Sequence, residues 1–355
     1  MDLGSTTIAV RILYANRNEN TTFSFPNPQY RYGADIITRI KHCIDNNAMQ
    51  DHLKKIVLDE LTCQLKMHLG EKYHFISNIV ISGNTTMQHI LRGLSVKGLS
   101  VAPFQPVDLS YAIEQPFIYP PGFSAFVGAD ILVGAQALKM GHQEPYELLI
   151  DLGTNGEMLL INKENGFATS TACGPVFDHA ISGAKYGSEC IHAIARCVKH
   201  NLIDTFGTIA EPFFESGISI DKHIIITQQN VRNFQLAKGA ILAGIQCLMQ
   251  CANITEESIA TVYLSGGLGF YLDQKDAFIL KMFPDSFRNK LVVVGNSSLE
   301  GATNLAKYMC NSNHTYTVAT QNIFSDYQDI LNRTTCYELA NLSNFQQIYM
   351  ESLDF

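Results

Sequence analysis

Two runs of apolar residues flank a short polar turn near the middle of the chain. The first run covers residues 148–150 and the second covers residues 158–161. Continuous apolar runs are typical of strands covered on both faces, and Asn155-Gly156 between the runs is a strong hairpin signal. Asp151 ends the first run, and glycine and small polar residues follow it. The pattern predicts a buried β-hairpin with a carboxylate at its turn.

The start of the chain carries a second copy of this pattern. Residues 2–12 align without a gap on residues 151–161, and Asp, Leu and Gly are identical in both copies. Glycine lets backbone N–H groups approach a phosphate, hydroxyl groups add donors, and a carboxylate can hold Mg²⁺ through water. A single copy would be explained by an ordinary hairpin. Two copies about half a chain apart predict a duplicated domain that grips nucleotide phosphates between its halves.

A third element is a short apolar strand at residues 262–264, which runs into Ser265-Gly266-Gly267. Together the three elements resemble the two phosphate motifs and the adenosine motif of the acetate and sugar kinase/Hsp70/actin superfamily. The resemblance implies an α/β fold of two duplicated ribonuclease H-like domains with a nucleotide cleft between them. We expect residues 1–145 to form the first actin-like subdomain and residues 146–355 the second, with a C-terminal tail.

The resemblance also implies roles for individual residues, with ATP and Mg as cofactors. Asp2 and Asp151 are expected to hold Mg²⁺ through water, and both are candidate catalytic residues. Glu157 is a candidate for positioning the attacking water, and its alternative is a hairpin residue that faces solvent. The expected phosphate and adenosine contacts are Gly4, Ser5, Thr6, Thr7, Gly153, Thr154 and Asn155 for phosphate, and Gly266 and Gly267 for adenosine.

Periodicity places the remaining elements around these motifs. Apolar residues at helical spacing predict a helix over residues 51–69, and Thr227 is placed to cap a long helix that ends near Cys251. Residues 76–82 read as a strand, after which Asn84 either caps a helix or faces a ligand. The Pro-rich residues 102–122 predict a loop or irregular insertion, and the tail from Thr334 predicts helical pieces.

Composition limits the class of protein. A chain of 355 residues with 46% hydrophobic and 16% charged residues is long enough for two globular domains. The net charge of −8 and the lack of a basic run argue against nucleic-acid binding. No signal peptide precedes Asp2, and Lys238, Gln246 and Gln250 interrupt the most apolar helix candidate, so a membrane span is not expected. These features favour a cytoplasmic protein.

Nine cysteines are present, and none forms a C-x-x-C pair or a ferredoxin-like cluster. Cys247 and Cys251 lie one helical turn apart, where buried thiols are the simpler interpretation and a metal or cluster pair is the alternative. Cys173 lies beside Gly174 and Pro175 in a loop of small residues and is the candidate functional thiol. No iron–sulfur cluster is expected in this chain.

Further motifs occur between the nucleotide motifs in a fixed order. They are Asn27-Pro28-Gln29, Tyr32-Gly33-Ala34-Asp35-Ile36, Gly83-Asn84-Thr85-Thr86-Met87, Ala102-Pro103-Phe104, Ala172-Cys173-Gly174-Pro175 and Gln235-Leu236-Ala237-Lys238. The set resembles the ATPase domain of reductive activators of corrinoid proteins. The resemblance implies a homodimeric module that couples ATP to the return of a corrinoid protein from Co(II) to Co(I). Electrons would come from a ferredoxin-type [2Fe–2S] domain, whose cysteine pattern this sequence lacks.

Some alternatives stay open. A small-molecule kinase uses the same fold, with Glu157 or Asp130 as a carboxylate base, and a non-enzymatic ATP-dependent switch is a further alternative. Only Met1 precedes Asp2, so most of the first core strand is absent from the sequence. We therefore expect a shortened form of the protein, a fragment, or the product of a misplaced start codon.

Overall fold

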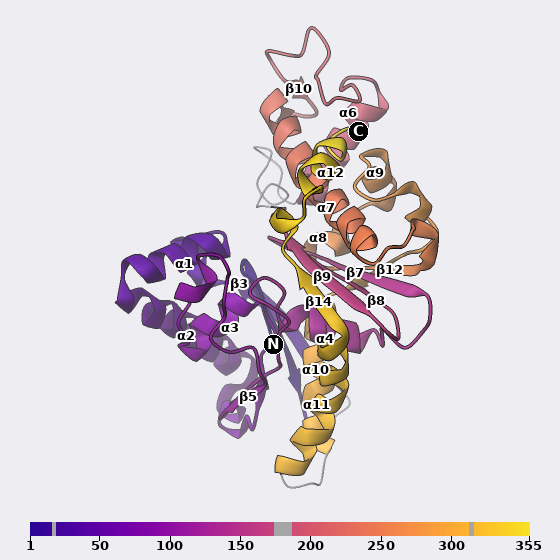
Figure 1. Ribbon diagram of the computed structural model, residues 1–355. Helices are drawn as coiled ribbons and strands as arrows, with labels where there is room; N and C mark the ends of the chain where they lie inside the picture. Colours follow the sequence, from indigo (N-terminus) through magenta and orange to yellow (C-terminus); the bar gives the residue numbers. More distant parts are fainter. Residues whose placement is uncertain (16–18, 174–186, 312–315) are drawn as a thin grey trace. The chain divides into compact units, whose positions relative to one another are not determined.

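The computed structural model describes residues 1–15, 19–173, 187–311 and 316–355 (Figure 1). Contacts divide the chain into two compact units. The first comprises Met1–Met140 and Asn296–Thr334, and the second comprises Gly141–Gly295 and Thr335–Phe355. The expected boundary after residue 145 lies close to the first crossover. Residues 296–334 return to the first unit, so the single boundary expected from the sequence does not describe the division of the chain.

The first unit contains two three-stranded sheets, ordered β1-β2-β3 and β4-β6-β5. Their strands are β1 (Asp2–Leu3), β2 (Thr7–Leu13), β3 (Asn20–Pro26), β4 (Ile79–Val80), β5 (Ala112–Glu114) and β6 (Phe117–Tyr119). The pairs β1–β2 and β2–β3 are antiparallel, whereas β4 and β6 are parallel. A parallel bridge between Asp2 and Ser82 joins the two sheets. The joined order is therefore β3-β2-β1-β4-β6-β5.

The second unit is built on a six-stranded sheet, ordered β13-β12-β7-β8-β9-β14. Its strands are β7 (Tyr146–Leu152), β8 (Gly156–Ile161), β9 (Gly166–Thr171), β12 (Ile259–Ser265), β13 (Leu291–Gly295) and β14 (Thr334–Tyr337), with a separate pair β10 (Ile218–Ser219) and β11 (Ile225–Ile226). Strands β7, β8 and β9 are antiparallel, and β12 is parallel to both β7 and β13. This repeats the pattern of the first unit and agrees with the predicted duplication.

Two groups of helices cover the sheet of the first unit (Figure 1). They are α1 (Ile36–Asp45), α2 (Asn47–Leu69) and α3 (Thr85–Arg92) on one side, and α4 (Ala129–Ala137), α10 (Ser297–Asn311) and α11 (Tyr316–Arg333) on the other. Val57 and Leu61 of α2 share a buried core with Leu3. Helices α10 and α4 pack so closely that a Cβ on Gly301 would lie 2.1 Å from the Val133 carbonyl oxygen. Glycine is required at this crossing.

The helices of the second unit surround a larger core. They are α6 (Gly187–Lys199), α7 (Gln228–Cys251), α8 (Gly266–Tyr271), α9 (Gln274–Ile279) and α12 (Phe345–Glu351). Ile150, Phe234 and Leu264 are buried together in this core. The predicted cap of α7 is confirmed, because Thr227 and Asn230 form a reciprocal capping box. Short 3-10 helices complete the chain at Pro28–Tyr32, Gly70–Phe75, Lys97–Leu99, Glu256–Ser258, Asp285–Phe287 and Leu339–Asn341.

Three predicted segments differ from the structure. The strand expected over residues 76–82 is reduced to β4, followed by the bridge at Ser82. The Pro-rich insertion contains the hairpin β5–β6, and the tail begins with strand β14 instead of helix. The β-branched and aromatic residues Thr334, Thr335 and Tyr337 favour a strand. This strand pattern is short, and the longer helical pattern of the tail hides it in a prediction from sequence. No helix in the described part of the chain is long and apolar enough to cross a bilayer.

Candidate nucleotide site

Both predicted phosphate hairpins form, but their turns differ in length. Asp2 lies opposite Ala9 across the first hairpin, whereas Asp151 lies opposite Glu157 across the second. The turn between the paired residues Leu3 and Ile8 therefore has one residue more than the turn of the second hairpin. The gapless alignment of the two copies is wrong beyond the turn, because identical residues before a turn do not determine its length. Ala9, not Ile8, occupies the place that Glu157 has in the second unit.

Asp2 stands at the end of β1 in a network of hydroxyl and amide donors. Ser298 Oγ donates to Asp2 Oδ1 at 2.8 Å, and Asn296 Nδ2 donates to Oδ2 at 2.8 Å. Ser82 Oγ lies 2.8 Å from Ser298 Oγ and extends the chain of hydroxyl groups. Burial raises the pKa of the Asp2 carboxyl, although the hydrogen bonds from Asn296 and Ser298 lower it in part. A positive charge beside this partly exposed carboxylate would favour its ionised form.

Asp151 has a similar environment in the second unit. It ends β7, and Ser265 Oγ donates to Asp151 Oδ2 at 2.8 Å. The same hydroxyl lies 3.1 Å from the Gly295 carbonyl oxygen at the end of β13. The carboxylate is therefore held by Ser265 at the end of β12, and Ser265 in turn contacts the end of β13.

The serines and glycines beside the two carboxylates occupy equivalent places. Ser82 pairs with Asp2 and Ser265 pairs with Asp151, in both cases in parallel register. A Cβ on Gly83 would lie 2.8 Å from the Leu3 carbonyl oxygen, and a Cβ on Gly266 would lie 2.4 Å from the Leu152 carbonyl oxygen. The backbone thus approaches the hairpin closely in both units. Sequence reasoning assigned only the second of these Ser-Gly turns to the site, although the shared dipeptide after an apolar strand was a usable signal.

Three polar side chains position the first turn. Asn27 Nδ2 donates to the Gly4 carbonyl oxygen at 2.8 Å, and Asn84 Nδ2 donates to Ser5 Oγ at 3.2 Å. Asn84 also caps α3, because its Oδ1 accepts from the Met87 N–H at 3.0 Å. The two interpretations of Asn84 are therefore compatible, since it caps the helix and contacts the turn.

Arg39 is the third of these side chains, and sequence reasoning missed it. It is fully buried in α1 and donates to the Ser5 carbonyl oxygen at 2.5 Å and to the Gly33 carbonyl oxygen at 2.9 Å. Its Nη1 lies 3.2 Å from Gln29 Oε1. Burial lowers the pKa of the guanidinium to about 10, so it remains charged at neutral pH. A buried cation directly behind the first turn favours an anion in front of it.

The remaining predicted contact residues lie in or beside the turns. Thr7 and Gly153 are exposed, Ser5 is buried, and the others in the two turns are partly exposed, namely Gly4, Thr6, Thr154 and Asn155. Gly266 has a φ of +89°, which favours glycine, and begins α8. Gly267 is exposed, and a Cβ placed on it would meet no atom within 4 Å. The surface at this turn is open to a ligand.

Glu157 and Asp130 are the two candidate carboxylate bases. Glu157 is buried on β8, so its alternative as a residue facing solvent is wrong. It shares one face of the hairpin with Asp151, because directly opposed residues project to the same side. Asp130 lies in the first turn of α4 in the other unit, where its Oδ1 accepts from the Ile131 N–H at 2.9 Å.

The cysteine environments do not favour a reactive thiol. Cys173 is buried against Gly156, and burial together with the charge of Glu157 raises its pKa, which suppresses the thiolate. Its neighbours Gly174 and Pro175 lie outside the described residues. Cys247 is buried with Leu339 and Ile348, as expected for a packed helix. Within the described residues, no group of three or more His, Cys, Asp or Glu side chains is placed to hold a metal ion.

Comparison with protein families gives two matches that together cover nearly the whole chain. Residues 1–143 match the RACo middle region. Residues 145–188 and 183–355 match the C-terminal domain of RACo, described as the ASKHA domain. The boundary between the two matches lies near the first crossover between the structural units.

Individual proteins similar to this chain are named for the activation or reduction of corrinoid proteins. The corrinoid activation enzyme RamQ of Eubacterium limosum is 26% identical over 79% of this chain and 58% of its own length. A [Co(II) methylated amine-specific corrinoid protein] reductase of Methanosarcina barkeri is 27% identical over 55% of this chain and 45% of its own length. A solved structure of a reductive activator for a corrinoid, iron–sulfur protein has a TM-score of 0.82 at 26% identity, covering 100% of this chain and 65% of that chain. The chain thus spans less than two thirds of these relatives.

Proposed function

The chain belongs to the RACo family, and on that premise we propose that it is the ATP-binding and ATP-hydrolysing module of a reductive activator of corrinoid proteins. The observation that carries the proposal is the repeated site, in which each unit presents a strand-end carboxylate, a following glycine turn and a serine from the adjacent parallel strand. The partner would be a corrinoid protein, which is what the relatives are named for acting on.

The residues of the two turns suit phosphate and Mg²⁺. The turns at residues 4–7 and 153–155 offer backbone N–H and hydroxyl donors, and the buried Arg39 guanidinium adds positive charge behind the first. Mg²⁺ usually keeps several waters and takes few carboxylates, so Asp2 and Asp151 need only hold its water ligands. The cation would neutralise phosphate charge that develops during transfer.

The proposal gives each residue of the site a specific role. The hydrogen bonds from Ser298 and Asn296 orient the carboxylate of Asp2, and the bond from Ser265 orients that of Asp151. Glu157, which lies opposite Asp151 across the hairpin, would orient a water for attack on the terminal phosphate. The open surface at Gly267 suits the adenosine.

In the overall reaction, one electron from a reduced iron–sulfur donor would convert the Co(II) corrinoid to Co(I), and ATP would be hydrolysed to ADP and phosphate. ATP can drive this unfavourable reduction only if it has different affinity for the free and the docked conformation of the module. A coupling of about 1–3 kcal/mol is typical of such linkages. The proposal includes a homodimer, which sedimentation velocity would test.

The test is ATP turnover by the full chain with a corrinoid protein in the Co(II) state, in the Co(I) state, and absent. We expect the Co(II) protein to change the rate several-fold, and we expect a smaller effect from the Co(I) protein. The Asp151→Asn variant provides the background rate. Equal rates in all three conditions, with stimulation by a sugar or a short carboxylic acid, would instead identify a small-molecule kinase.

A further inference from the structure

The hydroxyl group of Ser265 lies within hydrogen-bond distance of two acceptors at the end of β12. Its Oγ is 2.8 Å from Asp151 Oδ2 and 3.1 Å from the Gly295 carbonyl oxygen. A carboxylate and a carbonyl oxygen only accept, and a serine hydroxyl has one proton to donate. Ser265 is fully buried, so bulk water does not relieve the competition. The proton can therefore bond fully to only one of the two oxygens at a time.

The strand β13 is irregular where it delivers the Gly295 carbonyl group to this hydroxyl. Leu264 pairs with Val293, but the next residue of β12, Ser265, pairs with Gly295, so the register shifts by one residue at Val294. A bulge of this kind redirects the backbone and is often found beside active sites. Gly295 has a φ of +72°, a conformation that favours glycine. The local backbone therefore places this carbonyl oxygen beside Ser265.

Gly295 is also the last residue of the second unit before the chain crosses to the first unit, which resumes at Asn296. In the first unit, Asn296 Nδ2 donates to Asp2 Oδ2 at 2.8 Å. Asn296 Oδ1 accepts from the Leu299 N–H at 2.7 Å, in the manner of a cap on α10. The peptide group between Gly295 and Asn296 therefore joins two residues, each of which contacts the surroundings of one strand-end carboxylate.

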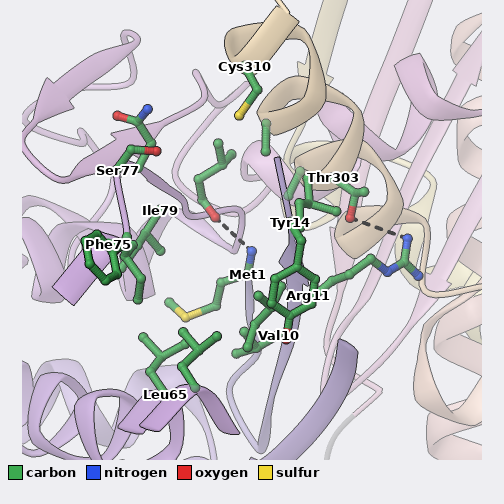
Figure 2. A pocket seen from close by; sticks show the side chains of 18 of the residues that line it. Met1, Val10, Arg11, Tyr14, Leu65, Phe75, Ser77, Ile79, Thr303 and Cys310 are labelled. Atoms are coloured by element: carbon green, nitrogen blue, oxygen red, sulfur yellow. Dashed lines mark hydrogen bonds between the residues drawn. The ribbon is translucent and has the colours of Figure 1, made fainter. Parts of the chain in front are cut away.

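Helix α10, which follows this crossover, is fixed to the other elements of the first unit. Arg11 of β2 forms an ion pair with Glu300 and donates to Thr303 Oγ1 at 3.4 Å. Figure 2 shows the Arg11 and Thr303 side chains with this hydrogen bond between them. Gly301 packs against the Val133 carbonyl group of α4. The chain immediately after the crossover is therefore well anchored.

We propose that the Ser265 hydroxyl is a switch between the Asp151 carboxylate and the backbone of the crossover. The carboxylate holds the proton as long as no cation compensates its charge, because hydrogen bonds to an ionised acceptor are the stronger ones. When a hydrated cation compensates that charge, the O–H group rotates about the Cβ–Oγ bond to the Gly295 carbonyl oxygen. Ser265 is thus a positioning residue, and the inference rests on the proposed function only for the identity of the cation and its nucleotide.

The switch gives the crossover two hydrogen-bonded states. Coupling between sites needs a two-state element of this kind, whose equilibrium a bound ligand biases. The proposed activity requires one, because ATP must distinguish two conformations if it is to drive a reduction. In the first unit the equivalent serine is placed differently, since Ser82 Oγ lies 2.8 Å from the Ser298 hydroxyl, which donates to Asp2. The switch therefore belongs to the second unit.

The test uses a pair of neighbouring residues that occurs only twice in the sequence, at Gly83-Asn84 and at Gly295-Asn296. A chain labelled with carbon-13 at the glycine carbonyl and with nitrogen-15 at asparagine therefore gives two signals in an HNCO spectrum. The Gly295 signal reports the switch, since a hydrogen bond polarises the carbonyl group and moves its carbon signal to higher frequency. The Gly83 carbonyl oxygen, which accepts from the Ala129 N–H at 3.2 Å, is the matched control in the other unit.

Two substitutions test the switch without any ligand. Asp151→Asn removes the charge, so the carbonyl signal of Gly295 should move to higher frequency. Ser265→Ala removes the proton donor, so the same signal should move to lower frequency. The Gly83 signal should stay in place in both variants, and Asp59→Asn, at an exposed position of α2, should move neither signal. An unchanged Gly295 signal in Asp151→Asn would overturn the switch.

Mg²⁺ with a nonhydrolysable ATP analogue, adenylyl imidodiphosphate, provides the second arm, with binding measured by calorimetry. At saturation the wild-type Gly295 signal should move in the same direction as in Asp151→Asn, and Ser265→Ala should show no such move. If the analogue binds and the signal moves equally in the wild type and Ser265→Ala, the switch is wrong. If the analogue does not bind, the proposed function fails, and the Asp151→Asn spectrum still decides the switch.

Discussion

Arg39 Nη2 donates a hydrogen bond of 2.5 Å to the backbone carbonyl oxygen of Ser5 and thereby ties α1 to the first predicted phosphate turn. The guanidinium also donates to the Gly33 carbonyl oxygen, so a single side chain links the turn to the loop before α1. Because the residue is fully buried, water cannot replace these bonds.

The Arg39→Met variant should therefore be less stable. We expect a loss of about 2–4 kcal/mol in the free energy of unfolding, because buried carbonyl groups lose their donor. The KM for ATP should also rise, since the turn loses its support. Urea unfolding and steady-state kinetics measure the two effects. Arg31→Met is the matched control, because Arg31 is exposed, and it should change stability by less than about 0.5 kcal/mol. Equal stability of both variants would contradict the role of Arg39.

Substitution of the two strand-end carboxylates tests the proposed chemistry. Asp151→Asn and Asp2→Asn keep the shape of each side chain but remove the charge that would orient the water ligands of Mg²⁺. We expect each to lower ATP turnover by about 100-fold or more. The far-ultraviolet circular dichroism should be unchanged. Asp59→Asn on the exposed face of α2 is the control and should keep full turnover. Wild-type turnover in either variant would remove that carboxylate from the mechanism.

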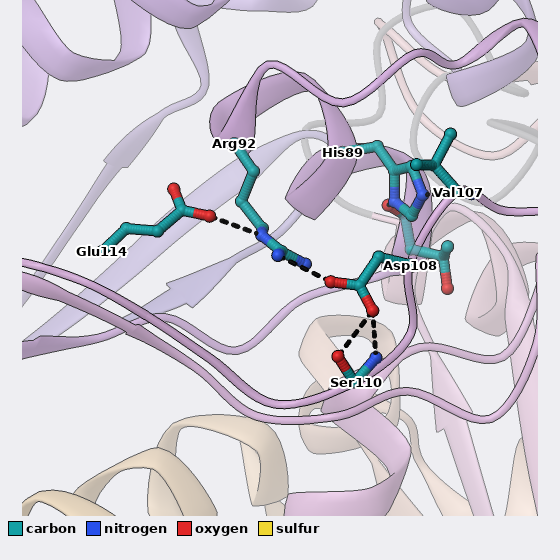
Figure 3. A network of polar contacts seen from close by, with 7 residues as sticks. His89, Arg92, Val107, Asp108, Ser110 and Glu114 are labelled. Carbon is teal, nitrogen blue, oxygen red and sulfur yellow. Dashed lines mark hydrogen bonds and ion pairs between the residues drawn. The ribbon is translucent and has the colours of Figure 1, made fainter.

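We expect a buried histidine in the first unit, His89, to make stability depend on pH; Figure 3 shows its surroundings. His89 Nδ1 lies 2.8 Å from the Thr85 carbonyl oxygen, and the Val107 N–H donates to Nε2 at 3.1 Å. Nε2 must therefore be the acceptor, and the ring is neutral with its proton on Nδ1. Burial lowers the pKa of His89, the Thr85 bond opposes this, and Arg92 lowers it while Asp108 raises it.

Because the folded-state pKa of His89 lies below the ordinary value of 6.5, the unfolded chain binds this proton more readily. The contribution to stability is present above about pH 6.5 and is lost as the pH falls below it. Urea unfolding of the wild type at pH 7.5 and 5.5 should show the decline, and His89→Gln should reduce it. His42→Gln, at an exposed position of α1, should retain the full decline. Identical pH profiles for the wild type and His89→Gln would refute this assignment.

We expect Lys238 to produce a second dependence of stability on pH, in the alkaline range. It is fully buried in α7, its Nζ donates to the Asp354 carbonyl oxygen, and it lies 5.5 Å from the centre of the Phe355 ring. Burial lowers the pKa of Lys238 to about 7; Lys281 lowers it further and Asp354 raises it. Between about pH 7 and its ordinary value of 10.5, the unfolded chain binds more protons than the folded chain, so stability should rise with pH.

The Lys238→Met variant lacks this titration. The difference in unfolding free energy between this variant and the wild type should therefore shift in favour of the wild type from pH 6.5 to pH 9.5. Guanidinium unfolding at the two values measures the shift. Lys199→Met, at the exposed end of α6, should follow the wild type at both. A constant difference for Lys238→Met would show that Lys238 keeps its proton throughout.

The sequence by itself determined the two hairpins, the carboxylates Asp2 and Asp151, and the glycine turn at Gly266, because these are local patterns of apolar, acidic and glycine residues. It also predicted the cap at Thr227, which depends on residues within one turn of helix, whereas it left Asn84 open between a helix cap and a ligand contact. Its motif set led to the family that the comparisons show.

Only the tertiary structure decided which side chains support these motifs. Ser298 is 296 positions from Asp2 in the sequence, and Arg39 is 34 positions from Ser5. Because the partners are so far apart, no local sequence pattern predicts either hydrogen bond. The same holds for the return of α10 to the first unit, where Gly301 permits close packing on Val133. The burial of Glu157 likewise depends on what covers its strand. Hydrogen bonds and burial are properties of residues that meet in space, and they are decided when the elements pack.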